Sequence, residues 1–319
     1  MLVYAIRRAA WAVMLCLIVS LFTFVIFYVV PRGQNTQRTR GTLDVTRTQQ
    51  FSGPVPVQYA KWVSGVVQGS LGHSYVSRRP VSDIIRSALP VTLALTIGGA
   101  VIWLLISLPL GILSAIRPRS LLDRTATVIV ILGVSIHPLW LGLFLSYLVG
   151  FKMQLLPFTG YCDMFSPVGA CGGPTQWFTH MLMPWFTFSL VFAALYVRMI
   201  RATVLETLQQ DYVGFARAKG MSEWAVMRRH VLPNAFIPVV PMVAMDISRF
   251  ALPTALFVET AFGLPGMGQT LRNALLRNDL PVIVGVVVVS CLVIAIVNFA
   301  GELIQVMIDP RVHLQPEPA

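Results

Sequence analysis

Charged side chains are scarce in this sequence: Asp, Glu, Lys and Arg together make up 12% of its 319 residues. A soluble domain carries about twice that share. Several uncharged stretches are long enough to provide the ~20 helical residues that cross a ~30 Å hydrocarbon core. The composition therefore excludes an ordinary soluble domain and predicts an all-α polytopic membrane protein embedded in a lipid bilayer.

Acidic side chains are the scarcer kind of charge, with 13 Asp and Glu against 24 Lys and Arg. The net charge of +11 raises the question of a nucleic-acid partner. The chain has neither zinc-finger spacing nor a basic run interleaved with stacking aromatics, so we predict no nucleic-acid partner. In so apolar a chain, basic residues are expected in loops that face the cytoplasm and its anionic lipids.

The common catalytic and metal-binding motifs are also missing. There is no G-x-x-x-x-G-K-[ST] loop for ATP, no G-x-S-x-G nucleophile turn and no metal-ligand spacing among the five histidines. We therefore predict that this chain is not an enzyme and holds no catalytic residue, no metal and no cofactor. A membrane enzyme with dispersed catalytic residues stays open at this point.

Six uncharged runs predict six transmembrane helices, at 9–30, 88–116, 125–150, 179–197, 234–259 and 280–308. The first run is longer than a signal-peptide core and no A-x-A cleavage site follows it, so we expect an uncleaved span with a cytoplasmic N-terminus. The basic residues of the short loops then lie mainly on the cytoplasmic side, as the positive-inside rule requires. The predicted organisation is 1–30 as N-terminus and first span, 31–87 as an external loop, 88–308 as a five-helix core that includes a cytoplasmic loop at 206–234, and 309–319 as a cytoplasmic tail.

The segment DYVGFARAKGMSEWAVMRRHVLPNA, at 211–235, is basic and lies between two predicted spans. Its pattern predicts two short helices separated at Gly220, with Ser222 capping the second. Trp224, Met227 and Val231 recur at helical spacing and predict one apolar stripe. Such an element can lie among lipid headgroups or fill a groove on a soluble subunit. Periodicity alone favours neither interpretation.

This segment resembles the cytoplasmic EAA loop of permease subunits in ABC importers, whose pattern is E-A-A-x3-G-x9-I-x-L-P. Ala216, Gly220, Leu232 and Pro233 match the pattern, whereas Gly, Phe and His stand where Glu, Ala and Ile are usual. Three further stretches resemble the dipeptide and oligopeptide branch of that family: the external segment 58–81, VETAFGLPGMG at 258–268 and DPR at 309–311. The PGDP-like turn usual after the first span is replaced by Pro-Arg-Gly-Gln at 31–34.

The resemblance implies a type I ABC-importer permease fold in the cytoplasmic (inner or plasma) membrane of a prokaryote, with both termini in the cytoplasm. The chain is similar to the first-permease (B-type) subunit, which forms half of a translocation pathway for di- and oligopeptides. The implied partners are a second homologous permease subunit, two ATPase subunits that bind ATP and Mg, and an external substrate-binding protein. Nickel chelates or oligosaccharides are alternative substrates within the family. A self-sufficient secondary transporter or channel is the alternative from a different class.

The resemblance also gives candidate roles to individual residues. The predicted ATPase-coupling loop contains Asp211, Ala216, Arg217, Lys219, Gly220, Ser222, Glu223, Trp224, Arg228, Leu232 and Pro233. The candidates for contact with the external binding protein are Tyr59, Trp62, Gly72, Phe262, Pro265, Gly266 and Gly268.

Two charges lie inside the predicted fifth span, Asp246 and Arg249, three residues apart and so on one helix face. A charge at the bilayer centre costs ~2.5–3.5 kcal/mol on insertion scales, and such charges are commonly functional. We predict that this pair lines the translocation pathway, with a self-neutralising structural pair as the alternative. His137 and Trp140 are further pathway candidates. Glu259, near the end of the same span, is expected at the membrane interface.

Cysteine is rare, with four residues in the chain. Cys162 and Cys171 lie in a loop predicted outside the cytoplasm, where disulfides persist. We predict a bridge between them, worth about 3 kcal/mol on the chain-entropy model; two free thiols are the alternative. Cys16 and Cys291 lie within predicted spans and are expected to pack as small apolar residues.

Overall fold

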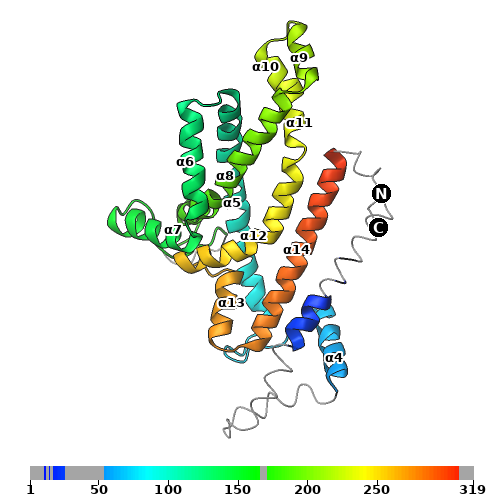
Figure 1. The fold of residues 1–319 in the computed structure, drawn as a ribbon. Coiled ribbons are helices and arrows are strands. Elements are labelled where there is room, and N and C mark those ends of the chain that lie inside the picture. Colours follow the sequence, from blue (N-terminus) through cyan, green and yellow to red (C-terminus); the bar gives the residue numbers. More distant parts are fainter. Residues whose placement is uncertain (1–10, 12–13, 15–16, 26–53, 166–170, 309–319) are drawn as a thin grey trace. The chain divides into compact units, whose positions relative to one another are not determined.

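A computed structural model describes residues 11, 14, 17–25, 54–165 and 171–308 of the chain (Figure 1). This described part is helical, contains no β-strand, and has an isolated β-bridge between His73 and Pro80. The prediction of an all-α fold is therefore confirmed. The predicted tail 309–319 and much of the predicted first span 9–30 lie outside the described residues.

The chain divides into two compact units, of which the first comprises the described parts of 1–91 together with 269–296. It contains α4 (Val55–Val67), the beginning of α5 (Val81–Ile116), most of α13 (Met267–Leu276) and most of α14 (Leu280–Ile308). Its buried apolar cluster consists of Phe24, Trp62, Val284 and Val288. Asp279 fixes the turn before α5, because its carboxylate accepts from Ser74 Oγ (2.5 Å) and from the Tyr75 amide (2.9 Å).

The second unit comprises 92–268 and the described part of 297–319. Besides the remainder of α5, it contains α6 (Leu121–Ser135), α7 (Pro138–Leu145), η3 (Ser146–Lys152), α8 (Pro174–Leu208), α9 (Asp211–Ala218), α10 (Glu223–Val226), η4 (Met227–Val231), α11 (Leu232–Phe236) and α12 (Val239–Phe262). A Cβ on Gly98 would lie 2.2 Å from the Trp185 ring, and one on Gly99 would lie 2.4 Å from the Phe188 ring. Both glycines therefore allow α5 and α8 to pack closely, as small residues do in membrane helices.

Three described helices are long and apolar enough to cross a membrane: Val81–Ile116, Pro174–Leu208 and Leu280–Gly301. Two helix pairs meet the same criterion only as bent spans: Asp123–Ser135 with Pro138–Lys152, and Glu223–Phe236 with Val239–Ile247. The described residues thus contain three to five candidate spans. The predicted count of six is not established, because much of the first predicted span lies outside them.

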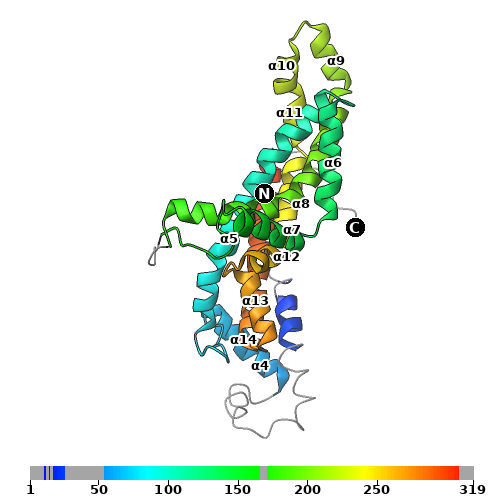
Figure 2. The same cartoon turned by 90° about the vertical axis from the view of Figure 1, so that its left-hand side faces the viewer.

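The predicted span 125–150 is not a single straight helix. α6 and α7 are bent by 103° and run in different directions in Figures 1 and 2. His137 is extended, with φ −69° and ψ 134°. Pro138 disfavours the α conformation in the residue before it and has no N–H to continue the ladder, so α6 ends and α7 begins at this point.

Candidate functional site

The predicted coupling loop forms a helical hairpin. α9 ends at Ala218, Gly220 turns the chain at φ +79°, and α10 begins after Ser222. Ser222 Oγ accepts from the Ala225 amide (3.4 Å), which caps α10. Glycine suits the left-handed conformation because it has no Cβ. The predicted reversal and cap are both present, and α9 and α10 lie beyond the ends of α8 and α11 (Figure 1).

One face of this hairpin is buried, and the other presents aromatic side chains. Its buried residues are Val213, Ala216, Val226, Met227 and Val231. Phe215 is 69% exposed and Trp224 is 71% exposed. The prediction that Trp224 shares an apolar stripe with Met227 and Val231 is therefore wrong. Residues 227–231 form the π-helical element η4, in which Met227 and Val231 are buried.

The charged side chains of the hairpin are exposed. Arg217 pairs with Glu223 across the turn through Nε–Oε1 (2.9 Å) and Nη2–Oε2 (3.1 Å). A pair this exposed contributes at most about 1 kcal/mol. Four other predicted coupling residues are also exposed: Asp211, Lys219, Arg228 and Pro233. Leu232 is half-buried. The polar surface is therefore available to a partner.

The carboxylate of Asp123, which sequence analysis missed, joins three helices. Asp123 of α6 accepts from Arg201 Nε (2.6 Å) and Nη2 (2.9 Å) of α8. The same carboxylate accepts from Ser114 Oγ of α5 and from the Arg119 amide (2.9 Å). Asp123 is buried, so the bidentate pair fixes the mutual positions of these helix ends. The spacing Ser120-x-x-Asp123 signalled a helix start, but nothing signalled Arg201 as its partner.

The pathway candidates His137 and Trp140 lie at the start of α7. His137 Nδ1 accepts from the Leu139 amide (3.3 Å), and its ring meets Phe257 edge-on with centroids 4.6 Å apart. Trp140 is 65% exposed and stacks on Phe144 with centroids 5.8 Å apart. His137 thus caps a helix, and a role of either residue in a pathway stays a prediction.

Asp246 has a described partner other than the predicted one. Its Oδ2 accepts from the hydroxyl of Tyr196 on α8 (2.8 Å). The side chain of Arg249 lies outside the described residues, so the predicted pairing of the two charges stays a prediction. Tyr196 is almost fully buried and had not been singled out in the sequence, because aromatic residues are common in apolar helices.

Glu259, which was predicted at the membrane interface, has a completely buried side chain, and its depth in the membrane stays a prediction. The hydroxyl of Thr92 donates to Glu259 Oε1 (2.6 Å), and the Met267 amide donates to that hydroxyl (2.8 Å). The Leu264 amide donates to the Glu259 carbonyl (2.9 Å). Residues 263–268 therefore fold back over the carboxylate. Position near a span end could not reveal this, because the direction of the following loop was unknown.

The glycines of the same loop make room for Glu259. A Cβ on Gly266 would lie 2.2 Å from its Oε1, and one on Gly268 would lie 2.5 Å from Leu256 Cα and 3.0 Å from Glu259 Oε2. Of the predicted binding-protein contacts in this loop, Phe262 and Gly266 are buried, Gly268 is half-buried and Pro265 is exposed. The glycines thus have an internal packing role that the sequence alone did not reveal.

The binding-protein candidates of the first unit are also tied into its structure. Trp62 belongs to the buried cluster, and the Tyr59 hydroxyl donates to the Leu17 carbonyl (3.1 Å) and contacts Ser20 Oγ (2.7 Å). Gly72 has φ +82° with open space around it, so its conformation, and not crowding, favours glycine. Contact of these residues with another protein stays a prediction.

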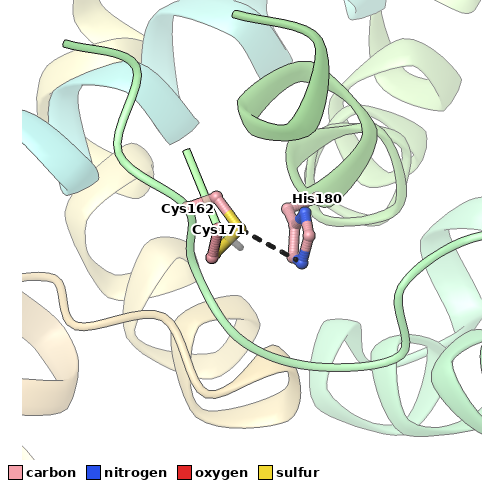
Figure 3. Close-up of side chains that lie close together, drawn as sticks. All are labelled: Cys162, Cys171 and His180. Carbon is pink, nitrogen blue, oxygen red and sulfur yellow. Dashed lines mark hydrogen bonds between the residues drawn. A yellow bond between two sulfur atoms is a disulfide. The ribbon is translucent and has the colours of Figure 1, made fainter. Parts of the chain in front are cut away.

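Cys162 and Cys171 form a disulfide in the structure, with Cα atoms 5.3 Å apart. Cys162 is buried, and its Sγ lies 3.5 Å from His180 Nε2 of α8 (Figure 3). Beside them, burial raises the pKa of the Tyr161 hydroxyl, partly offset by a hydrogen bond with Trp177. The contacts of Cys162 with His180 and of Tyr161 with Trp177 thus hold the loop between η3 and α8 against α8.

Two stretches of the chain match families of transport proteins. Residues 1–96 match the N-terminal region of membrane components in binding-protein-dependent transport systems, and residues 107–314 match the family described as binding-protein-dependent transport system inner membrane component. The chain belongs to this family. It is therefore a multi-pass inner-membrane transport component, not a catalytic subunit, and the expected ABC-permease identity is confirmed.

Relatives of this transport component cover nearly its whole length. A putative peptide permease protein of Brucella suis biovar 1 (strain 1330) is 35% identical, over 98% of this chain and 100% of the relative. The oligopeptide transport system permease protein AppB of Bacillus subtilis (strain 168) is 30% identical, with coverage of 98% and 100%. The probable D,D-dipeptide transport system permease protein DdpB of Escherichia coli (strain K12) is 31% identical, with coverage of 96% of each.

A solved structure supports the fold of the permease. The structure titled as inward-facing conformations of the MetNI methionine ABC transporter superposes with a TM-score of 0.55, at 19% identity, over 71% of this chain and 96% of that one. The likeness shows the fold. It agrees with the type I ABC-importer permease fold predicted from the sequence motifs.

Proposed function

We propose that this permease subunit carries di- and oligopeptides through the inner membrane in an ATP-driven importer. The descriptions of its relatives as peptide, oligopeptide and D,D-dipeptide permeases support that substrate class. Within the chain, Asp246 of α12 and the Tyr196 hydroxyl of α8 offer polar groups between two largely apolar helices. A carboxylate at membrane depth suits the charged amino terminus of a peptide.

The exposed α9–α10 hairpin is the element that we assign to energy coupling. Phe215 and Trp224 project from it with more than two thirds of their surface exposed, whereas its other face is packed. Exposed aromatic anchors on a short helical element suit a groove in a soluble subunit. We assign that groove to the ATPase subunits, two per complex, which bind the ATP and Mg that this chain has no motif to hold.

The remaining parts of the importer follow from the same assignment. A second, homologous permease subunit forms the other half of the pathway, and an external binding protein delivers the substrate. The chain keeps both termini in the cytoplasm, with residues 31–87 outside and the coupling segment 206–234 inside. Helix α4 around Tyr59 and the loop around Pro265 face the binding protein in this arrangement.

The coupling assignment is tested by Gly220→Val with Gly214→Val as its matched control. Neither glycine has a neighbour within 4 Å of an added Cβ, but only Gly220 has a positive φ. A side chain in the left-handed conformation costs about 1–2 kcal/mol, and a β-branched side chain costs more. We therefore expect the turn between α9 and α10 to be distorted in Gly220→Val and not in Gly214→Val. The complete importer is reconstituted in liposomes, and peptide uptake and ATP hydrolysis are measured together.

We expect Gly220→Val to insert normally but to transport less peptide per ATP, and Gly214→Val to match the unaltered importer. Normal coupling in Gly220→Val would contradict the docking role. Uptake of nickel chelates or oligosaccharides in place of peptides would retain the importer and contradict the peptide assignment. Uptake without any ATPase subunit would contradict both and indicate a self-sufficient transporter.

A further inference from the structure

Three potential metal-ligand atoms gather at the start of α8. The Sγ atoms of Cys162 and Cys171 and a ring nitrogen of His180 all lie within 4.8 Å of one another. Figure 3 shows the imidazole facing the disulfide from the helix, while both cysteines come from the preceding loop. No standard metal-binding spacing connects the three residues in sequence, so the sequence pattern gave no sign of the cluster.

The orientation of His180 is that of a ligand. Its Nδ1 lies 2.8 Å from the Gln176 carbonyl, one turn earlier in α8. In the neutral ring, a proton on Nδ1 donates to that carbonyl and leaves the Nε2 lone pair directed at Cys162 Sγ, 3.5 Å away. Metal-ligating histidines are oriented in this way, with the second nitrogen bonded to a backbone carbonyl or carboxylate.

We propose that, once the disulfide is reduced, Cys162, Cys171 and His180 bind a thiophilic divalent cation of the Zn²⁺ type. With Zn–S near 2.3 Å and Zn–N near 2.0–2.1 Å, tetrahedral geometry places a sulfur and a nitrogen ligand ~3.6 Å apart. The observed 3.5 Å between Cys162 Sγ and His180 Nε2 meets that requirement without movement of either element. Two sulfur ligands stand ~3.8 Å apart, so the second sulfur must move away from the first.

The chain permits that movement of Cys171. Gly172 and Gly173 follow it directly, and Gly173 has φ +93° with no atom within 4 Å of a Cβ. Because the Gly172 amide donates to Gln176 Oε1 (2.6 Å) and the Gly173 amide donates to the Asp163 carbonyl (3.0 Å), the adjustment falls to rotation of the exposed Cys171 side chain. Two thiolates and one imidazole leave the fourth tetrahedral position for water, as in sites with three protein ligands.

The change from disulfide to metal site takes two steps, reduction of the disulfide and binding of the cation. A dithiol reductant gives two electrons and two protons to the Cys162–Cys171 bond, which breaks to two thiols while the dithiol closes its own disulfide. The divalent cation then displaces both thiol protons and takes two thiolates and the His180 lone pair as ligands. The disulfide and the metal site therefore exclude each other, and the redox state of the loop selects between them.

The proposal is tested on the full chain in detergent, with Cys16→Ser and Cys291→Ser so that two cysteines remain. The chain is reduced with a phosphine, freed of reductant, and titrated with Co²⁺, whose absorption reports tetrahedral thiolate coordination. We expect one equivalent to bind to the reduced chain and none to the oxidised chain. His180→Ala is expected to weaken binding by more than about tenfold, the least that even outer-shell partners contribute.

His73→Ala is the matched control, because this exposed histidine is not part of the cluster. It should bind Co²⁺ as the parent does. As a measurement that needs no histidine variant, Zn²⁺ should slow alkylation of the two reduced cysteines. Equal Co²⁺ binding by the oxidised chain, unchanged binding in His180→Ala, or no binding by a chain with two titrated thiols would each overturn the proposal. The result is independent of what the permease transports.

Discussion

At Glu259, the Thr92 hydroxyl donates to one carboxylate oxygen while it accepts from the Met267 amide. The carboxylate is completely buried, so loss of its donors would leave the full cost of removing it from water. Gly266 lies so close that a Cβ there would overlap the carboxylate. The space that Glu259 occupies therefore explains Gly266, whereas Gly268 is crowded first by Leu256 and Gly263 is favoured by its φ of +66°.

Gly266→Ala is expected to destabilise the protein, because the new methyl group must displace either the Glu259 carboxylate or the loop. Overpacking of this kind costs about 1–3 kcal/mol. The thermal unfolding temperature of the detergent-solubilised chain measures the effect. The adjacent, exposed Pro265→Ala is the control and should change it little. An unchanged unfolding temperature in Gly266→Ala would contradict the close packing of Gly266 against the Glu259 carboxylate.

Helices α5, α6 and α8 meet at Asp123, whose carboxylate accepts from Ser114 on the first and Arg201 on the third. Removal of one partner of a buried ion pair leaves the other charge uncompensated. Asp123 and Ser114 lie on either side of the turn from α5 to α6, and Arg201 lies on α8, which continues into α9. The pair therefore ties the turn between α5 and α6 to α8.

Arg201→Ala is expected to lower the free energy of unfolding by about 3 kcal/mol, the lower end of the range for broken buried pairs. Arg198→Ala, one turn earlier on α8 with an exposed side chain, should stay within about 0.5 kcal/mol of the parent. Unfolding in a denaturant series measures both variants. Equal stability of the two variants would show that the pair contributes nothing to the helix arrangement.

Over the whole molecule, local patterns predicted local structure, whereas contacts between distant residues could not be predicted. Gly220 and Ser222 act within a few residues of themselves, so their conformation and capping were readable from the sequence. The Thr92–Glu259 hydrogen bond spans 167 residues, and the Arg201–Asp123 pair spans 78. Such pairs depend on how helices pack, which a single sequence does not specify. A proline such as Pro138 indicates a kink, but the bend of 103° depends on how the surrounding helices pack and could not be predicted.

The predicted pathway role of Asp246 and Arg249 can be tested only in the assembled transport complex. Asp246→Asn and Arg249→Ala are each expected to impair peptide uptake more than assembly, because a pathway charge acts on passing substrate. The double variant should be milder than the sum of the single ones, which is the sign of a coupled pair. Uptake by purified complexes, normalised to assembled subunits, measures this. Failure of both single variants to assemble, with normal uptake in whatever complex does form, would make the pair structural.

In the proposed importer the α9–α10 hairpin docks onto a soluble ATPase, and a photo-crosslinking side chain at position 224 in native membranes tests this docking. The same group at position 140 is the control, since Trp140 is nearly as exposed as Trp224 but lies on α7. We predict that position 224 crosslinks to a protein whose sequenced peptides include a G-x-x-x-x-G-K-[ST] loop, and that position 140 does not. Crosslinks from position 224 to lipid alone, or equal capture of that ATPase from position 140, would contradict the account.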